Sequence, residues 1–332
     1  MGSNRIMNKR NFAFKLHWWV KEHLLFSHSP LQNEVMLSYT LPDEYEDFAV
    51  HPCVRYIPQA IGGHKWWLAL SPYPMYDIKK ENILLFHGID ESDDHPPQEW
   101  SFVKEVCGTH PQGFNSDPNL YYDGKELWVI WREWGTENIP AGVPYICVRC
   151  SRTKDGIHFS GHETIANNEF CEYSMQGDTT MCPIVVSHKG KITMYGSYYA
   201  YEPFLRPIGV SRYLLDGHFF RMDGFHHHDN MLFDLWHFDL FEYNGYLYQV
   251  ITGQFGNAIY VGRSEDGKVF KYSKKPLYAY PWFLKKNFFY KPTAQVLGSK
   301  LFVFFPRKKE KGSLRIVVRS MDAEVLERFD YR

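Results

Sequence analysis

The chain has 332 residues, a formal net charge of −1 and 17% aromatic residues. This charge excludes the strongly basic surface expected of a protein that binds nucleic acid or an anionic membrane. No stretch approaches the roughly 20 apolar residues that a helix needs to cross a bilayer, so no membrane span is predicted. The high aromatic content suits half-buried strands and also sugar binding, because the C–H faces of sugars stack on flat rings.

Residues 1–45 are predicted to form an N-terminal extension that is partly helical. Phe14, Trp18 and Leu25 recur at helical spacing, which predicts an amphipathic helix that packs on the rest of the chain. Charged and histidine residues interrupt the apolar run, so it does not match a secretory signal. The sequence therefore predicts a cytoplasmic protein, and association with a phage particle fits as well. It carries no signal for oligomeric state.

From residue 46 onward, one pattern occurs five times. A small or polar residue, often followed by Pro, leads an apolar strand, and a turn connects this strand to a second, aromatic strand. The turns contain residues typical of hairpins, such as Asp123-Gly124 and Asn244-Gly245. A weaker signal later in the units, Arg-Ser or Cys-Ser before another turn, brings each unit to about four strands. The five leading residues are His51, Asp117, Cys182, His237 and Lys291.

Five units of four strands predict an all-β chain folded as a five-bladed β-propeller, preceded by the extension. A β-sandwich would give short strands as well, but it has no reason to repeat one four-strand pattern at near-equal spacing. The propeller is assigned to residues 46–332. Its blades are expected at about 46–108, 109–170, 171–228, 229–282 and 283–332. Because the innermost strand of each blade runs along the central channel, the five leading residues are expected to converge there.

The segment SDPNLYYDGKELWVIW at residues 116–131 resembles the blade signature of five-bladed propeller glycosidases of glycoside hydrolase families 43 and 32. The segments HPCVRY and HKWWLALSPYP in blade one resemble a group of such propellers associated with bacterial surface polysaccharides and phages. The resemblance spans about residues 46–332 and implies a carbohydrate substrate in the channel. It also implies a base on blade one, an orienting Asp on blade two and an acidic Glu on blade three. Asp117 matches the orienting Asp, whereas His51 and Met181-Cys182 replace the other two carboxylates.

Four residues are predicted to be catalytic: Asp117, Glu81, Asp178 and His237. Glu81 lies at the start of the third strand of blade one, and Asp178 precedes the inner strand of blade three by a few residues. An inverting glycosidase needs two carboxyl groups with room for water between them. A histidine such as His237 is an alternative proton donor, because it titrates near neutral pH.

Six further residues are predicted to bind substrate from inner strands or from the loops that follow strands: His51, Glu133, Trp134, Tyr73, Asp239 and Lys291. No metal site is predicted. Cys147 and Cys150 lack a second pair of ligands, and adjacent histidines at 226–228 would point to opposite faces of a strand. No cofactor is predicted from the residues. The glycosidase resemblance implies a Ca²⁺ ion in the channel, but the sequence identifies no ligands for it.

The predicted function is a glycoside hydrolase that acts on an oligo- or polysaccharide in the central funnel. The missing carboxylates also support a carbohydrate-binding or assembly propeller without catalysis. A lyase or a transferase is a further alternative, since His51, His237 and Lys291 could supply a base and bind an acidic sugar. A propeller that binds only proteins is the remaining alternative.

Overall fold

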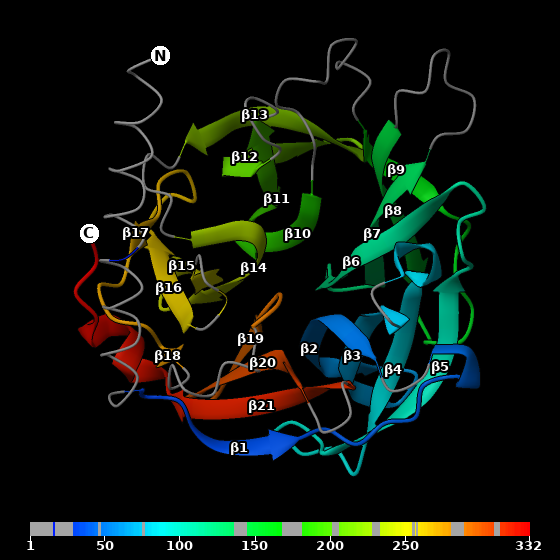
Figure 1. The fold of residues 1–332 in the computed structure, drawn as a ribbon, viewed down its shortest axis with the longest axis horizontal. Helices are drawn as coiled ribbons and strands as arrows, with labels where there is room; N and C mark the ends of the chain where they lie inside the picture. The colour runs from blue at the N-terminus through cyan, green and yellow to red at the C-terminus, as the bar shows by residue number, and fades with distance from the viewer. Residues whose placement is uncertain are drawn as a thin grey trace.

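The computed structural model describes residues 16, 29–45, 48–74, 77–135, 145–167, 181–200, 206–227, 233–253, 256, 258–279, 289–308 and 313–332. Within these residues, five antiparallel sheets stand around one central axis (Figure 1). The prediction of an all-β, five-bladed propeller is confirmed. The helix predicted around Phe14 and Leu25 and the predicted catalytic residue Asp178 lie outside the described residues, apart from one helical position at Leu16.

The first three sheets each contain four strands in chain order. Sheet one consists of β2 (Ala49–Ile61), β3 (His64–Pro72), β4 (Ile83–Ile89) and β5 (Glu99–Cys107). Sheet two consists of β6 (Gly113–Tyr122), β7 (Leu127–Gly135), β8 (Tyr145–Thr153) and β9 (Glu163–Asn167). Sheet three consists of β10 (Met181–His188), β11 (Lys191–Ala200), β12 (Arg206–Asp216) and β13 (Phe219–His227).

The last two sheets depart from this simple order. Sheet four consists of β14 (Phe233–Tyr243), β15 (Tyr246–Gly253), β16 (Ala258–Ser264) and β17 (Lys271–Tyr272), and β18 (Tyr278–Ala279) also pairs with β16. Sheet five consists of β19 (Thr293–Leu297), β20 (Lys300–Lys308), β21 (Leu314–Asp322) and, as its outermost strand, β1 (Gln32–Met36). Short 3-10 helices occupy Asp43–Tyr45, Ile78–Lys80 and Ala323–Arg328.

The ring is closed by strands from both ends of the chain. β1 belongs to the segment that was assigned to the N-terminal extension, yet it pairs with β21 in sheet five. Val35 faces Val318 in this pairing, and Glu34 accepts a charged hydrogen bond of 2.8 Å from Nε of Arg319. The extension is therefore tied to the last blade through backbone pairing and an ion pair.

Apolar residues from neighbouring sheets fill the space between the blades. Adjacent strand residues point to opposite faces of a sheet, so Trp66 and Trp67 belong to two different layers. Trp66 packs with Phe304 between sheets one and five, and Trp67 packs with Trp131 between sheets one and two. All four of these side chains are at most 1% exposed, so they belong to the core between the blades.

Each of the first three inner strands carries a β-bulge at its leading residue. In sheet one, the four residues 50–53 of β2 lie opposite only the three residues 69–71 of β3, so β2 has one extra residue. The inner strands β6 and β10 have the same extra residue, between Ser116 and Asn119 and between Met181 and Ile184. The residue in the bulge has a left-handed backbone, with φ of 52° at His51, 56° at Asp117 and 54° at Cys182. Such a conformation is unfavourable for residues other than glycine, and bulges commonly redirect side chains next to functional sites. The His-Pro, Asp-Pro and Cys-Pro pairs are thus located inside strands, which begin at Ala49, Gly113 and Met181, and not in the turns before them.

Buried polar contacts cross the central axis between blades that are not neighbours. Arg55 of β2 binds Asp239 of β14 through two hydrogen bonds of 2.9 and 2.6 Å. Asp239 is 1% exposed and also accepts hydrogen bonds from Thr293 Oγ1 and Ala294 N of blade five. Lys291 Nζ donates to the carbonyl of Pro118 in blade two at 2.7 Å. These contacts join blades one, two, four and five at the centre of the ring.

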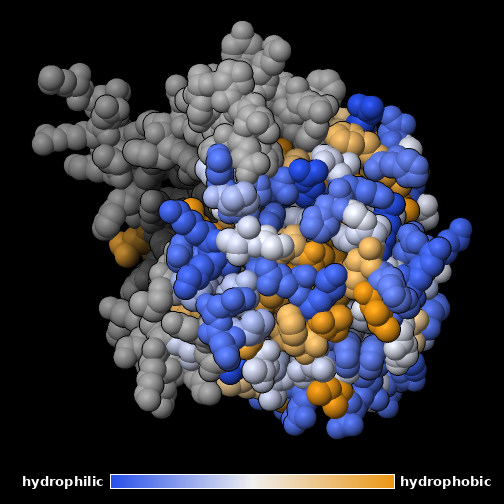
Figure 2. Space-filling model, turned by 90° about the vertical axis from the view of Figure 1, so that its right-hand side faces the viewer, coloured by the Kyte–Doolittle hydropathy of each residue, from blue (hydrophilic) through white to orange (hydrophobic). Residues whose placement is uncertain are grey.

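The outer surface of the ring is mixed. On the side of the ring in Figure 2, hydrophobic residues lie in small groups among hydrophilic ones. In the part of the chain that the structure describes, no helix is long and apolar enough to cross a membrane.

The substitution Asp239→Ala is expected to lower the free energy of unfolding by about 2–4 kcal/mol, because it leaves the largely buried guanidinium of Arg55 without its counter-charge and removes the hydrogen bonds to Thr293 and Ala294. Denaturant unfolding followed by tryptophan fluorescence measures this difference. Asp322→Ala, which breaks an exposed pair with Lys300, is the control and should leave stability almost unchanged. Equal effects of the two substitutions would contradict a central role for the Arg55–Asp239 pair.

Candidate functional site

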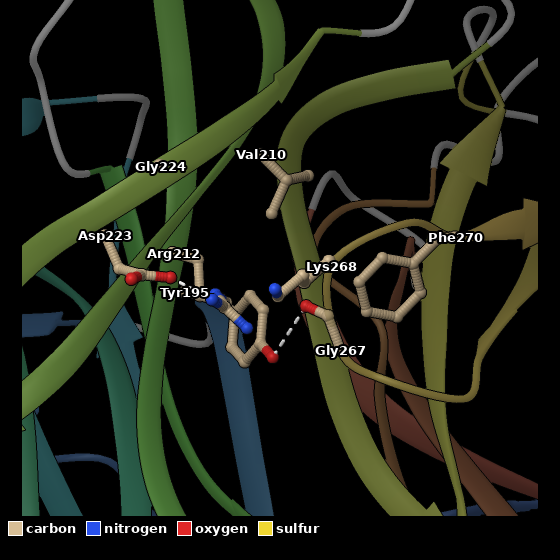
Figure 3. A pocket seen from close by; sticks show the side chains of 8 residues that line it. All are labelled: Tyr195, Val210, Arg212, Asp223, Gly224, Gly267, Lys268 and Phe270. Carbon is tan, nitrogen blue, oxygen red and sulfur yellow. Dashed lines mark hydrogen bonds and ion pairs between the residues drawn. The ribbon is translucent and has the colours of Figure 1, made fainter.

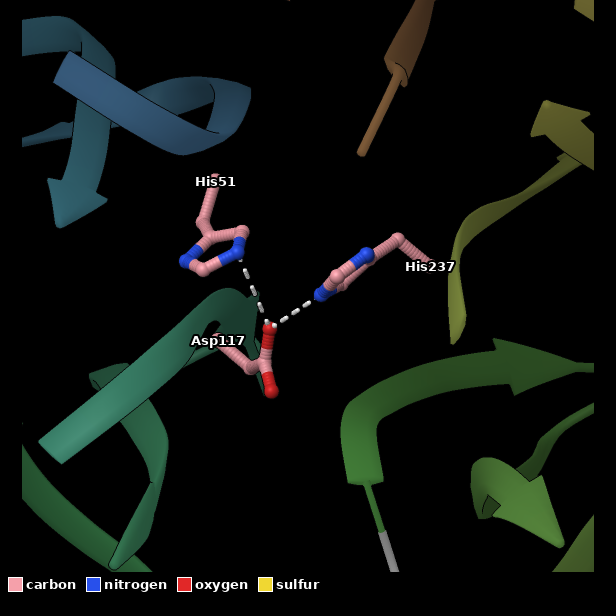
Figure 4. A group of neighbouring side chains, drawn as sticks. All are labelled: His51, Asp117 and His237. Atoms are coloured by element: carbon pink, nitrogen blue, oxygen red, sulfur yellow. Dashed lines mark ion pairs between the residues drawn. The ribbon is translucent and has the colours of Figure 1, made fainter. Parts of the chain in front are cut away.

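Three leading residues of inner strands meet at one end of the central axis. His51 comes from blade one, Asp117 from blade two and His237 from blade four (Figure 4). Asp117 Oδ1 lies 3.0 Å from Nε2 of His237 and 3.7 Å from Nε2 of His51. The three side chains are 0–5% exposed, and the two imidazole rings are 4.7 Å apart between centroids. The structure therefore brings together two predicted catalytic residues and one predicted substrate-binding residue.

Burial and charge act on this group in opposite directions. Burial disfavours the charged imidazolium and lowers the pKa of His51 well below its usual range, although the charge of Asp117 opposes this effect. Burial would raise the pKa of Asp117, but opposing interactions, above all the charge of Arg132, outweigh it and hold that pKa well below its usual range. At neutral pH the group thus contains an ionised carboxylate beside a neutral His51.

Arg132 holds the other oxygen of Asp117 and was not predicted from the sequence. Its Nε lies 3.0 Å from Oδ2 of Asp117, and its Nη2 donates to Oγ of Ser116 at 2.6 Å. Arg132 stands opposite Ser116 in the pairing of β6 with β7, and it is 6% exposed. A charged residue at the end of the apolar strand run LWVIW was the signal that could have revealed it. Asp117 therefore presents Oδ2 to a fixed cation and Oδ1 to the histidines.

Glu81 reaches the same region from the loop between β3 and β4. It follows the 3-10 helix Ile78–Lys80, its carbonyl accepts a hydrogen bond from Asn115 N at 3.3 Å, and its side chain bonds Ser116. Burial and the negative charge of Asp117 raise the pKa of Glu81 to about 8, against the opposing effects of Arg132 and Ser116. Two neighbouring carboxyl groups thus differ in protonation at neutral pH, which is the pattern of acid–base sites.

Two tyrosines complete the surroundings. The ring of Tyr290 lies 4.4 Å from that of His237 and 5.0 Å from that of His51, between centroids. Burial raises the pKa of Tyr290 well above its usual range, and the nearby Asp117, Glu81 and Tyr73 raise it further. Tyr73 was predicted to bind substrate and lies in this neighbourhood. Tyr290 was missed, although it directly precedes the leading residue Lys291 of blade five.

The remaining predicted substrate-binding residues are engaged in contacts outside the group of His51, Asp117 and His237. Glu133 follows Arg132 in β7 and pairs with Arg149 at 2.7 Å. Trp134 stacks on Phe114 at 5.2 Å between ring centroids, and Phe114 in turn lies against the guanidinium of Arg132. Asp239 and Lys291 are committed to the axis contacts described above. The structure gives Glu133, Asp239 and Lys291 pairing roles within the protein.

Two depressions lie elsewhere on the ring. One of about 240 Å³ is bordered by blades three and four; it contains the ion pair of Arg212 with Asp223 and a 2.9 Å hydrogen bond from Tyr195 Oη to Gly267 O (Figure 3). The other, of about 260 Å³, is lined by the inner strands of all five blades at the opposite end of the axis from Asp117. Neither depression includes a predicted catalytic residue.

Metal-binding capacity is concentrated at the same centre. Among the described residues, His51, Asp117 and His237 form the one group of three side chains whose donor atoms all lie within 4.8 Å of one another. The five described cysteines, including Cys147 and Cys150, are buried and form no disulfides. The sequence predicted no metal site. The grouping of His51, Asp117 and His237 does not test that prediction, but it identifies residues that can hold an ion.

No protein-family profile and no curated protein sequence matches the chain. Solved structures do share its fold. One is an N-acetylgalactosamine deacetylase from F. plautii in complex with blood group B trisaccharide, with a TM-score of 0.68 and 13% identity over 89% of this chain and 96% of that one. Another is a family 117 glycoside hydrolase from the marine bacterium Zobellia galactanivorans, with a TM-score of 0.59 and 12% identity over 89% and 92% of the two chains.

A third is a family 43 β-xylosidase/α-arabinofuranosidase from a compost metagenome, with a TM-score of 0.55 and 10% identity over 85% of this chain and 94% of that one. The predicted resemblance to the five-bladed propeller glycosidases is thus confirmed at the level of the fold. The similar structures include several glycoside hydrolases.

The substitution Glu81→Gln is expected to change how stability depends on pH. The folded wild-type protein keeps the Glu81 proton up to about pH 8, whereas the unfolded chain loses it near pH 4.5. Wild-type stability should therefore decrease as pH rises across this range, by an amount of order a few kcal/mol, and then level off. In chelator-treated protein, melting temperatures at several pH values should show a smaller decrease for Glu81→Gln. Parallel curves for the two proteins would show that Glu81 has an ordinary pKa.

Proposed function

We propose that this protein is a hydrolase that acts on an oligo- or polysaccharide at the centre of the ring. The observation that carries the proposal is the convergence of Glu81, Asp117, His51 and His237 from three blades at one buried position. Packing alone does not require two imidazoles and two carboxyl groups at one point of the axis, because burial of such groups is unfavourable unless they are paired. The sugar-cleaving activities of several proteins with this fold support a carbohydrate substrate.

The proposed roles follow from the protonation states. Glu81 holds a proton at neutral pH and can give it to the leaving group. Asp117 remains ionised beside Arg132 and, with the two imidazoles, can bind and polarise the attacking water. In glycoside hydrolysis, water adds to the anomeric carbon, the C–O bond to the leaving sugar breaks, and the leaving oxygen receives the proton.

A second candidate is removal of an acetyl group from an amino sugar. Two observations favour it: His51 stands where the resemblance to the propeller glycosidases implies a carboxylate, and the F. plautii protein of similar fold is an N-acetylgalactosamine deacetylase. In this reaction water adds to the acetyl carbonyl, the C–N bond breaks, and the leaving amine receives the proton. The residues and their proposed roles are the same, but the bond that breaks is different.

The test is a screen of the purified protein on bacterial surface polysaccharides, aryl glycosides and N-acetylated oligosaccharides. New reducing ends report glycosidic cleavage, and released acetate reports deacetylation. Glu81→Gln and Asp117→Asn are each expected to lower turnover at least about 100-fold. Glu242→Gln makes the same kind of change on an inner strand at the opposite end of the axis, so it should leave turnover within a few-fold of wild type.

Equal turnover in all four proteins would place the reaction elsewhere. Saturable sugar binding with neither reducing ends nor acetate would overturn the hydrolase proposal and support a propeller that only binds carbohydrate.

A further inference from the structure

We propose that His51, Asp117 and His237 form a binding site for one divalent transition-metal ion. The site would use Nε2 of each histidine and Oδ1 of Asp117, which are the atoms that face one another in Figure 4. Three protein ligands leave at least one coordination position for water or substrate, as in catalytic rather than structural metal sites.

The distances fit one shared ion. Two atoms that are each about 2.1 Å from a metal lie about 3.0 Å apart at a right angle and about 3.6 Å apart at 120°. The separations of Asp117 Oδ1 from the two Nε2 atoms are 3.0 and 3.7 Å. The donor atoms of the two histidines are no more than 4.8 Å apart. A small adjustment of side-chain torsions therefore suffices to place all three atoms in contact with one ion.

The side chains are also insufficiently paired without a ligand. His51 is 2% exposed, yet neither of its ring nitrogens makes a hydrogen bond to any residue that the structure describes. Both carboxylate oxygens of Asp117 lie close to nitrogens of Arg132 and His237. Among the described residues, however, none of these contacts has the geometry of a hydrogen bond. Buried polar atoms are normally paired, and an unpaired one costs about 1–3 kcal/mol. An ion between the three side chains would satisfy His51 Nε2 and Asp117 Oδ1 together.

The backbone holds two of the ligands in an unfavourable conformation. His51 and Asp117 both have a left-handed backbone immediately before a proline. Such residues are retained mainly where the surrounding structure fixes them, and they cluster at functional sites. The bulges of blades one and two are thus used to direct two side chains to one point on the axis.

The donor atoms indicate the kind of metal. Ca²⁺ takes six to eight oxygen ligands, and two of the three donors here are imidazole nitrogens. Imidazole with a carboxylate suits Zn²⁺ and other first-row transition ions. These donors therefore favour a transition-metal ion over the Ca²⁺ ion that the glycosidase resemblance implied.

The neighbouring residues match the second layer of a metal site. Arg132 binds Oδ2 of Asp117 and leaves Oδ1 directed toward the histidines, and such outer contacts fix the orientation of metal ligands. Glu81 lies beside this group through its bond to Ser116. If the protein is the hydrolase proposed above, a metal-bound water would be its nucleophile and Glu81 its proton-transfer group. The metal site itself does not depend on that activity.

A second pair of histidines provides a matched control. His64 and His87 stack at 3.5 Å between ring centroids, and His64 lies 3.6 Å from Glu91. This group also combines two imidazoles with a carboxylate, but His64 is 35% exposed in its side chain. His64 and His87 lie on β3 and β4, the second and third strands of sheet one, and not on the inner strand β2.

The experiment measures metal binding directly. Chelator-treated wild-type protein and three variants, His51→Ala, His237→Ala and the double variant His64→Ala/His87→Ala, are titrated with Zn²⁺ by calorimetry after their folding is checked by circular dichroism. The wild type and the double variant are expected to bind one equivalent of Zn²⁺ more than His51→Ala or His237→Ala. Because the comparison is a difference, binding by other histidines, such as the run at 226–228, cancels. Anomalous diffraction from crystals of Zn²⁺-loaded wild-type protein locates the ion even where a variant does not fold.

The proposal is supported by an anomalous peak between His51, Asp117 and His237, together with the loss of one bound Zn²⁺ in His51→Ala and in His237→Ala. Equal stoichiometry in all folded proteins, or no peak at this position, overturns it. Stronger binding of Ca²⁺ than of Zn²⁺ at the site overturns the assignment of the metal class. Zn²⁺ binding without any carbohydrate turnover would contradict the proposed hydrolase while leaving the metal site in place.

Discussion

The polar side chains that are buried at the centre of this propeller share one constraint: each is removed from water and needs a hydrogen-bond partner inside the ring. Arg55 with Asp239, and Lys291 with the carbonyl of Pro118, find partners in blades across the centre. His51 does not find one among the described residues. This contrast separates the axis into a part that holds the blades together and a part where buried polar atoms lack hydrogen-bond partners among the described residues.

The position of that second part follows from the backbone of the inner strands. Without the one-residue bulges at His51 and Asp117, the alternation of side chains along β2 and β6 would continue unbroken through these positions. The unfavourable φ values at both residues are offset by the pairing of the rest of each strand, which is long and well buried. The stability of the blades thus maintains a local conformation that the two dipeptides would not adopt by themselves.

Much of the architecture was readable from the sequence because the signals are local. Hairpin turns, strand alternation and the repeated leading residues each depend on neighbours within one blade, and they were sufficient to predict five blades. The same leading residues correctly identified His51, Asp117 and His237 as neighbours in space.

Other features depend on residues far apart in the chain, and their absence from the prediction has a physical reason. The charged partner of Asp239 and the acceptor of the Lys291 hydrogen bond lie in non-adjacent blades, so no pattern within a blade distinguishes a structural contact from a substrate contact. Arg132 could be assigned only once the register of β6 against β7 was known. Glu81 was recognised as a candidate, but its raised pKa arises from burial against blade two, which spacing does not encode.

The closure of the ring by β1 and β21 also imposes an order on synthesis. β1 precedes its partner β21 in the chain by the whole of the first four blades, so its edge stays unpaired until β21 has been translated. Pairings of such long sequence separation form slowly, because the entropy of closing a large loop must be overcome first. The fifth blade is therefore the last part of the ring that can be completed, and a ribosome-bound chain that stops before residue 314 presents an open propeller with an exposed sheet edge.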